Sequence, residues 1–209
     1  GTDTELRATC QITVVEGPGA GIPNYDAWRG SAHGDGDALA VHVWDARGEI
    51  PADCARCHST YGVRDWLGDD GSPAGGVDAP PPTGTVVECV ACQNATAMAL
   101  ETVTFPSGAE YGGLDRDVLC MQCHGGRSST DEIDAVVAAA AAADDDTVSL
   151  SLQLRTPHYQ GSGATLVGGV ARGGYQYAGR TYDARFGHIE DLSSCTDCHD
   201  PHTLDVPYG

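Results

Sequence analysis

Eight of the nine cysteines in this chain of 209 residues form four Cys-x-x-Cys pairs. The pairs are Cys54/Cys57, Cys89/Cys92, Cys120/Cys123 and Cys195/Cys198. Their first members are separated by 35, 31 and 75 residues, so the chain has no fixed repeat and is not predicted to be a solenoid. Paired cysteines in this number indicate a fold organised by a metal, by disulfides or by an attached cofactor.

Three of the four pairs continue directly into a histidine, which is His58, His124 or His199. Cys-x-x-Cys-His is the attachment sequence for c-type haem. Two thiols at this spacing reach the two vinyl groups of one haem, and the histidine that follows is placed to ligate the iron. We therefore predict covalent haem c at these three motifs, with the three histidines as proximal ligands.

Three other uses of the pairs are weighed against haem. Cys89/Cys92 and Cys120/Cys123 together have the composition of a four-thiolate zinc site, but such a site leaves the three following histidines unexplained. Disulfides occur in extracytoplasmic chains, yet four closely spaced pairs are an inefficient way to cross-link a fold. A thioredoxin-like redox role needs one pair in a βαβ context, which this sequence does not show.

The second pair departs from the motif because Gln93 follows Cys92. We predict that Cys89 and Cys92 still bind a fourth haem, whose iron takes histidine from elsewhere and not Gln93, because a carboxamide is a weaker axial ligand than imidazole. The alternative is a disulfide with no haem at this position. Cys10 is left over, as a free thiol or as an intermolecular bridge.

The histidine count matches four haems with two histidine ligands each, because the chain has eight histidines. The candidates for the five non-motif ligands are His33, His42, His158, His188 and His202. Methionine is a poor candidate, since one of the two methionines lies inside a haem motif. We expect bis-histidine, low-potential iron. The alternative for each of the five is a surface or propionate-binding role, and it weighs most for His202, which closely follows His199.

The composition is poor in residues that build an apolar core. Leu, Ile, Val and Phe make up 36 of 209 residues, about 17%, and the formal net charge is −19. Such a chain does not fold on its own side chains, so the haems are expected to form the core. We predict mostly irregular coil with short α-helices and few strands, as one haem-cored multihaem cytochrome domain over 1–209. Residues 1–27 form an N-terminal extension and 28–206 the haem-binding region.

Local patterns predict a few regular elements. Ser129 and Glu132 form a capping-box pattern ahead of a run of alanines, which predicts a helix from Ser129 to about Ala143. Short helices are expected at Asp37–Trp44 and at the haem motifs, and short strands at Val86–Val87 and Thr102–Phe105. A turn-rich loop is predicted for Gly68–Gly76, and a stiff connector for Ala79–Gly84.

The charge excludes some partners. The chain has 30 acidic residues, 11 Arg and no Lys. Its net negative charge has the wrong sign for binding nucleic acid through the phosphates. No apolar run approaches the length of a transmembrane helix. An Asp-rich surface without Lys is similar to the surfaces of proteins from high-salt organisms, although high-GC coding favours the same residues.

Several stretches resemble one family in detail. They are Val87–Asn94 with Gln in place of His, Val103–Gly108, Cys120–Arg127, Pro157–Tyr159, Gly163–Leu166, Arg185–His188 and Cys195–His202. Over about residues 28–206 the chain resembles the multihaem c-type cytochromes, in particular the four-haem extracellular cytochromes that polymerise into conducting filaments. His33 matches a distal-ligand position of that family.

The resemblance implies a non-catalytic electron carrier, in which closely packed bis-histidine haems pass electrons along a head-to-tail homopolymer outside the cell or at its surface. Other cytochromes or extracellular electron acceptors would be its partners. In the family one distal histidine often comes from the neighbouring subunit, and His33 is our candidate because it precedes the first motif. The alternatives are a soluble periplasmic shuttle, and a multihaem reductase with an open site at the Cys89/Cys92 haem.

Overall fold

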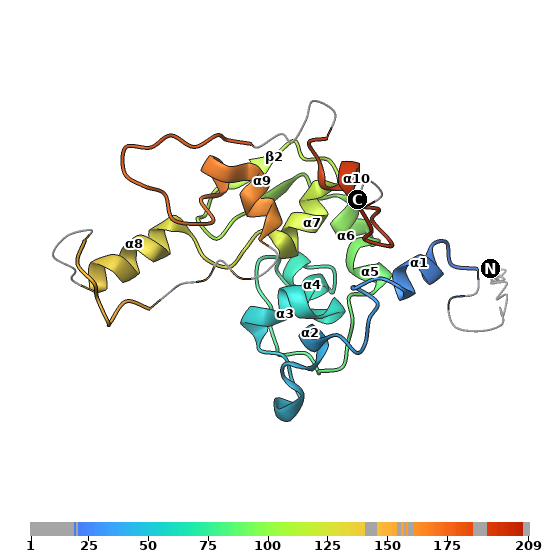
Figure 1. Cartoon of the computed structure of the whole chain (residues 1–209). Helices are drawn as coiled ribbons and strands as arrows, with labels where there is room; N and C mark the ends of the chain where they lie inside the picture. The colour runs from blue at the N-terminus through green and yellow to red at the C-terminus, as the bar shows by residue number, and fades with distance from the viewer. Residues whose placement is uncertain are drawn as a thin grey trace, which may run out of the picture.

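The computed structural model describes residue 19 and residues 21–140, 146–153, 156, 158, 161–185 and 192–206. These residues are mostly short helices and coil, as expected from the composition (Figure 1). The helices are α1 Tyr25–Arg29, α2 Leu39–His42, the 3₁₀ turn η1 Asp45–Arg47, α3 Ala52–His58, α4 Thr60–Leu67, α5 Cys89–Cys92, α6 Ala95–Met98, α7 Asp117–His124, α8 Thr130–Ala139, α9 Ser162–Ala171 and α10 Cys195–Cys198. The strands β1 Thr102–Thr104 and β2 Glu110–Gly112 form a two-stranded antiparallel sheet in which Val103 pairs with Tyr111.

The capping box predicted before the alanine run is present at the start of α8. The Ser129 hydroxyl accepts a hydrogen bond from the Glu132 N–H at 3.4 Å, and the Glu132 carboxylate accepts one from the Ser129 N–H at 3.0 Å. Helix α8 ends at Ala139 in the structure, and residues 141–145 lie outside the described part of the chain. Two reciprocal bonds at the first turn thus fix where the helix begins.

The predicted strand at Val86–Val87 is wrong, whereas Thr102–Phe105 is confirmed as β1 to within one residue. The Val87 N–H donates to the His33 carbonyl at 3.1 Å, and the Val86 carbonyl accepts from the Thr60 hydroxyl at 2.7 Å. The backbone hydrogen-bonding groups of this segment are therefore paired with a loop carbonyl and a side-chain hydroxyl, and not with a neighbouring strand. The helix predicted over Asp37–Trp44 is shorter than expected: α2 occupies its centre, and η1 begins after the two turn residues Val43 and Trp44.

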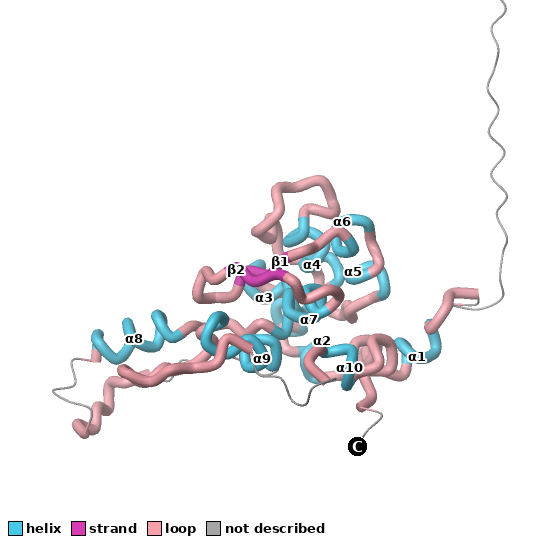
Figure 2. The backbone as a smooth tube through the Cα atoms, turned by 90° about the horizontal axis from the view of Figure 1, so that it is seen from above, coloured by secondary structure: helices cyan, strands magenta, loops and turns pink. Residues whose placement is uncertain are grey.

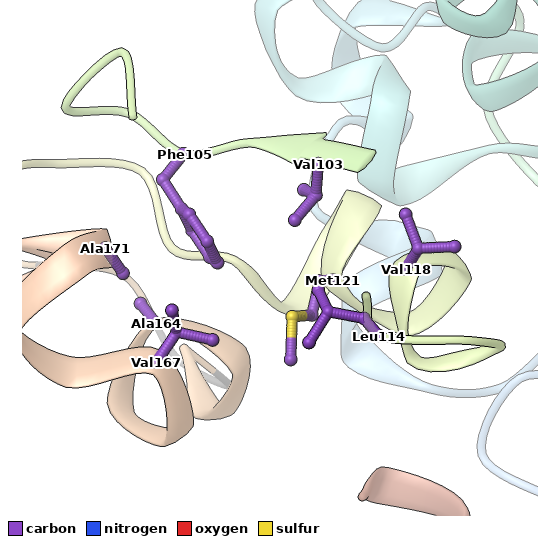
Figure 3. Close-up of a cluster of buried hydrophobic side chains, with 8 residues drawn as sticks. All are labelled: Val103, Phe105, Leu114, Val118, Met121, Ala164, Val167 and Ala171. Atoms are coloured by element: carbon purple, nitrogen blue, oxygen red, sulfur yellow. The ribbon is translucent and has the colours of Figure 1, made fainter. Parts of the chain in front are cut away.

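The larger apolar cluster lies between α7, α9 and the strand β1 (Figure 3). It consists of Val103, Phe105, Leu114, Val118, Met121, Ala164, Val167 and Ala171. A second cluster of Val63, Leu67, Ala91 and Ala97 joins α4 to α5 and α6. Each cluster therefore includes a residue from a Cys-x-x-Cys helix, Met121 in α7 and Ala91 in α5.

The apolar core is small. Fifteen hydrophobic side chains are buried among the described residues, and five of them are alanines. Alanine buries one methyl group and contributes far less transfer free energy than Leu or Phe. The apolar surface that the polypeptide buries by itself is therefore small, in keeping with the low count of core-forming residues.

Two helix pairings position the cysteine motifs. Helices α3 and α4 pack closely, because a Cβ placed on Gly62 would lie 2.2 Å from the Ala55 carbonyl oxygen. Helix α7 contacts α3, α9, β1 and α10 and is the centre of the arrangement. Helix α8 extends away from this body, as Figures 1 and 2 show from two directions. None of the described helices has the length and hydropathy to cross a membrane.

Candidate functional site: four helical cysteine turns

Each Cys-x-x-Cys pair lies in a single helical turn. The pairs are carried by α3, α5, α7 and α10, and α5 and α10 begin and end at their cysteines. Residues three apart share one face of a helix, so both thiols of each pair project to the same side. This is the arrangement that lets two sulfurs attach to one flat group.

The turn at α10 is held by a second capping box. The Ser194 hydroxyl accepts from the Asp197 N–H at 3.2 Å, and the Asp197 carboxylate accepts from the Ser194 N–H at 2.7 Å and the Ser193 N–H at 2.8 Å. These backbone bonds from Ser193 and Ser194 hold the pKa of Asp197 below its usual range. The cap therefore stabilises a helix that is only four residues long.

All eight motif cysteines are free thiols. The disulfide alternative for Cys89/Cys92 is therefore not formed, and Cys10 lies outside the described residues. The part of the chain that the structure describes also has no group of three or more His, Cys, Asp or Glu side chains placed to hold a metal ion. A haem iron needs only two ligands from the protein, because the porphyrin supplies the other four.

The motifs meet although they are far apart in sequence. The Cys57 thiol lies 3.8 Å from the Cys123 carbonyl oxygen, and the Cys123 thiol lies 3.5 Å from the Arg56 carbonyl oxygen. The Cys195 N–H donates to the buried Asp117 carboxylate at 2.9 Å. The first motif therefore adjoins the third, and the third adjoins the fourth.

The thiols perturb one another where the motifs meet. A hydrogen bond from the Cys123 thiol lowers the pKa of Cys57 to about 7, and the same bond, with burial, raises the pKa of Cys123. The contact between Cys120 and Cys195 lowers the pKa of Cys120 and raises that of Cys195 in the same way. Such mutual shifts require thiol groups of two different motifs within hydrogen-bond reach.

Two of the histidines predicted to be proximal ligands face a second histidine. The ring centroids of His124 and His33 are 6.2 Å apart, and those of His58 and His158 are 6.1 Å apart. A metal–imidazole bond of about 2 Å on each side of one iron, plus the ring radii, gives centroids roughly 6 Å apart. Both pairs therefore have the spacing of two imidazoles that bind opposite faces of one haem iron.

Burial affects these histidines in the direction that ligation needs. It lowers the pKa of His33, helped by the neighbouring His124, and it lowers the pKa of His58. Neutral imidazole is the form that binds a metal.

The Trp44 ring packs edge-on against His58, with centroids 4.9 Å apart. The tryptophan thus restricts the orientation of the His58 ring.

Three histidines have Nδ1 occupied by an oxygen. His58 Nδ1 lies 3.3 Å from the Ala40 carbonyl oxygen, and His199 Nδ1 lies 3.1 Å from that of Leu204. His42 Nδ1 lies 2.7 Å from the Asp45 carboxylate, whose hydrogen bond raises the pKa of His42. An oxygen acceptor at Nδ1 fixes the tautomer that presents Nε2 to a metal.

The second motif has a different neighbour. Gln93 Nε2 lies 3.4 Å from His202 Nε2, and Asn24 Nδ2 also lies 3.4 Å from the same ring nitrogen. Gln93 and His202 line a mainly apolar cavity of about 690 Å³. Its lining includes thiols from three motifs and three histidines, namely Cys89, Cys92, Cys120, Cys195, His33, His199 and His202. An apolar cavity of this size suits a large planar group.

The predicted site residues are thus brought together in part. His58 and His124, the predicted proximal ligands, each face a predicted distal ligand, and His199 and His202 line the cavity of the second motif. His42 is exposed beside Asp45, and His188 lies outside the described residues. The two pairings were not predictable from sequence, because neither His33 nor His158 is near its partner along the chain.

His33 is not on a free segment. Its carbonyl accepts from the Val87 N–H at 3.1 Å, and the adjoining Trp28 indole donates to the Val87 carbonyl at 2.8 Å. Its ring faces His124 of the same chain. The structure therefore places the His33 ring beside His124 of its own chain, and the intersubunit role expected from its position before the first motif stays a prediction.

Comparison with family models, with curated proteins and with solved structures finds no match to this chain. The functional argument therefore rests on the motifs and on the geometry of their neighbours. Thiol pairs on one helical face, imidazoles in facing pairs and an apolar cavity between motifs fit covalently attached haem.

Proposed function

We propose that this chain is a multihaem c-type cytochrome that carries electrons. The observation that supports this most directly is the coincidence of two independent features at two of the motifs. Each has the full attachment sequence, and at each the proximal imidazole faces a second imidazole at 6.1 or 6.2 Å. Sequence spacing produces the first feature and tertiary structure the second.

The chain's own residues would have distinct tasks. Cys54 and Cys57 would tether one haem, and His58 and His158 would supply its iron ligands. Cys120 and Cys123 would tether another, which His124 and His33 would hold. Haem bound in this way supplies a reversible one-electron iron couple, whose potential two imidazole ligands keep low. Two histidines on one iron leave no position for a substrate, which favours a carrier over an enzyme.

Contact between motifs supports transfer within the chain. Thiols of the first and third motifs are neighbours, and so are those of the third and fourth. Groups attached to these thiols would be close together. The protein's contribution to electron transfer is to fix that spacing and to exclude water around each iron.

Self-assembly into a head-to-tail homopolymer outside the cell is the second part of the proposal. It rests on the family resemblance, and one surface feature supports it. Val148 and Leu150 are 87% and 96% exposed in the segment that follows α8. A heterologous contact that does not close on itself produces an open filament. Other cytochromes or extracellular acceptors would then exchange electrons with the polymer.

Intact-mass and spectroscopic measurements on the matured protein test the carrier proposal. We expect four covalently bound haems and low-spin signals from the two irons with facing histidines. Fewer than three haems by mass would overturn the proposal. High-spin iron at the first and third motifs would overturn the assigned ligands while leaving haem attachment intact.

A further inference from the structure

Thiols from different motifs meet on both sides of helix α7. On one side, the Cys57 and Cys123 thiols share a hydrogen bond, and each lies near a backbone carbonyl oxygen of the other's helix, at 3.8 and 3.5 Å. On the other side, the Cys120 and Cys195 thiols share a hydrogen bond. All four cysteines are half-buried and not sealed from solvent. Both thiols of α7 therefore have a sulfur partner on a neighbouring helix.

Contacts that do not involve sulfur hold the three helices at these positions. Arg56 Nη2 donates to the Gln122 carboxamide oxygen at 3.4 Å, between α3 and α7. Arg127, which follows α7, pairs with Asp53 of α3 at 3.3 Å. On the other side, the first N–H of α10 donates to the buried Asp117 carboxylate at 2.9 Å. Two cysteines can be bridged only where their backbones are adjacent, and these contacts keep the backbones adjacent.

We propose that these four thiols are an oxidation site of the haem-free chain, which forms the two intermotif disulfides Cys57–Cys123 and Cys120–Cys195. The oxidant is a small disulfide such as glutathione disulfide. In each step two cysteines lose two electrons and two protons, and one S–S bond forms between them. The S–S bond of the oxidant breaks, and two glutathione thiols leave.

The cross-links and haem attachment use the same thiols and exclude one another. The inference goes beyond the proposed function, because the cross-links require the packing of α3, α7 and α10 and not the haem. They would close loops of 66 and 75 residues, which restricts the unfolded chain before a cofactor is present. Haem attachment at the first, third and fourth motifs would then require prior reduction of the cross-links.

Disulfides within the motifs are the competing outcome. Cysteines three residues apart close a far shorter loop, so an unfolded chain is expected to join Cys54 to Cys57 more often than Cys57 to Cys123. In the structure the Cys54 thiol lies 3.6 Å from the Asp53 carboxylate and 3.9 Å from Arg127 Nη1, without a thiol of another motif beside it among the described residues. The pattern of disulfides therefore reports whether the fold directs the oxidation.

Peptide mapping of the full-length, haem-free chain tests the proposal. The chain is oxidised with glutathione disulfide, its remaining thiols are alkylated, and it is digested with trypsin without reduction. Trypsin cleaves after Arg56, so Cys54 and Cys57 fall in the separate peptides 48–56 and 57–64. A disulfide within the first motif and a disulfide to α7 thus give peptide pairs of different mass.

We expect one species in which peptide 117–127 is joined to both 57–64 and 186–209. Peptide 57–64 joined to 48–56 would overturn the proposal, and so would four thiols that stay unreacted. The same oxidation in concentrated guanidinium chloride is the control. Without the helix packing, the disulfides should shift to pairs within the motifs.

Matched serine variants identify the thiols. Cys57→Ser should abolish the link to 57–64, whereas Cys54→Ser, in the same motif, should leave the link between 57–64 and 117–127 intact. Likewise Cys195→Ser should abolish the link to 186–209, and Cys198→Ser should leave it. Equal loss in the two variants of either motif would show that the proposed pairing is wrong.

The haem content of the matured protein separates this inference from the proposed function. At least three covalent haems, with no intermotif cross-link in the haem-free chain, would overturn the oxidation site and leave the carrier proposal standing. Both cross-links in a chain that gains fewer than three haems after reduction and maturation would support the oxidation site and overturn the carrier proposal.

Discussion

The facing imidazole pairs His33/His124 and His58/His158 depend on the placement of single side chains. If His33 and His124 bind one iron, removing the His33 ring leaves that iron with one protein ligand. We predict that His33→Ala converts one haem per chain to a high-spin form, and that His158→Ala does the same to a different haem. Electron paramagnetic resonance and absorption spectra of each variant measure the change.

Dilution separates an intrachain ligand from an intersubunit one. Because His33 and His124 belong to the same chain in the structure, wild-type protein diluted to a monomer should keep this haem low-spin. High-spin iron that appears on dilution and disappears on concentration would show that a neighbouring subunit supplies the ligand. The variant Asn24→Ala serves as a control for changes near the N-terminal helix.

Asp117 is the residue with the clearest structural role outside the ligand set. Its carboxylate is 1% exposed, accepts from the Cys195 N–H at 2.9 Å and lies 3.8 Å from the Arg185 guanidinium. Asp117→Ala would leave the half-buried N–H of Cys195 without this acceptor and the Arg185 charge unpaired. We predict a loss of about 3 kcal/mol in the free energy of unfolding, the scale expected when one partner of a buried pair is removed.

A surface ion pair provides the control for this prediction. Asp131 and Arg172 approach to 2.6 Å, but their side chains are 59% and 41% exposed. Asp131→Ala should therefore change the free energy of unfolding by less than about 1 kcal/mol. Chemical denaturation of both variants, followed by haem absorbance and by circular dichroism, measures the difference. Equal effects would show that burial of Asp117 is not what makes it important.

At the scale of elements, the contact between α3 and α4 depends on a glycine. A Cβ on Gly62 would lie 2.2 Å from the Ala55 carbonyl oxygen and 2.6 Å from the Ala55 Cβ, so the helices must separate to accept a side chain. We predict that Gly62→Ala destabilises the protein by about 1–3 kcal/mol. It should also perturb the haem spectrum, because α3 carries the first cysteine motif.

Gly76→Ala is the matched control for the helix contact. Gly76 has open space around its Cα and no positive φ, so the same methyl group is accommodated there. The melting temperature of the Gly76→Ala protein should stay close to that of the wild type. If Gly62→Ala melts at the same temperature as Gly76→Ala, the close packing of α3 on α4 does not contribute to stability.

The elements differ in how far the sequence predicts them. The helix after Ser129 was predictable because its capping box is local, and β1 because a short Thr/Val run precedes a turn. The failure at Val86–Val87 has a tertiary cause: the Val87 N–H is satisfied by His33 and the Val86 carbonyl by Thr60, both distant in sequence. The pairings of His33 with His124 and of His58 with His158 depend on loops without periodicity, so no sequence pattern reports them.

At the scale of the whole molecule, stability without cofactor is the central question. The two apolar clusters hold eight and four buried residues, which is little for a chain with a formal net charge of −19. We predict that a variant with all eight motif cysteines replaced by alanine shows no cooperative thermal unfolding. Differential scanning calorimetry of that variant and of the holoprotein tests this. A cooperative transition in the variant would show that the polypeptide core suffices.

The proposed assembly would have to overcome charge repulsion, because each chain has a net charge of −19, to which haem propionates would add. At 1 M salt the Debye length falls to about 3 Å, so repulsion between subunits is largely screened. Polymerisation, measured by sedimentation velocity and electron microscopy, should therefore increase with salt concentration. Wild-type protein that stays monomeric at high concentration and high salt would contradict the filament and favour a soluble shuttle.

The segment after α8 is where a subunit contact is expected to be most sensitive. Val148 and Leu150 are 87% and 96% exposed, next to a turn in which the Leu152 N–H donates to the Ser149 carbonyl at 3.4 Å. Burying such a side chain in a contact contributes about 1.5–3 kcal/mol. Leu150→Ser should thus raise the protein concentration needed for polymerisation by at least about tenfold, since 1.4 kcal/mol corresponds to a factor of ten. Leu39→Ser removes a leucine that is 81% exposed on α2, outside this segment, and should leave the threshold unchanged. If both variants polymerise like the wild type, the segment after α8 does not form the subunit contact.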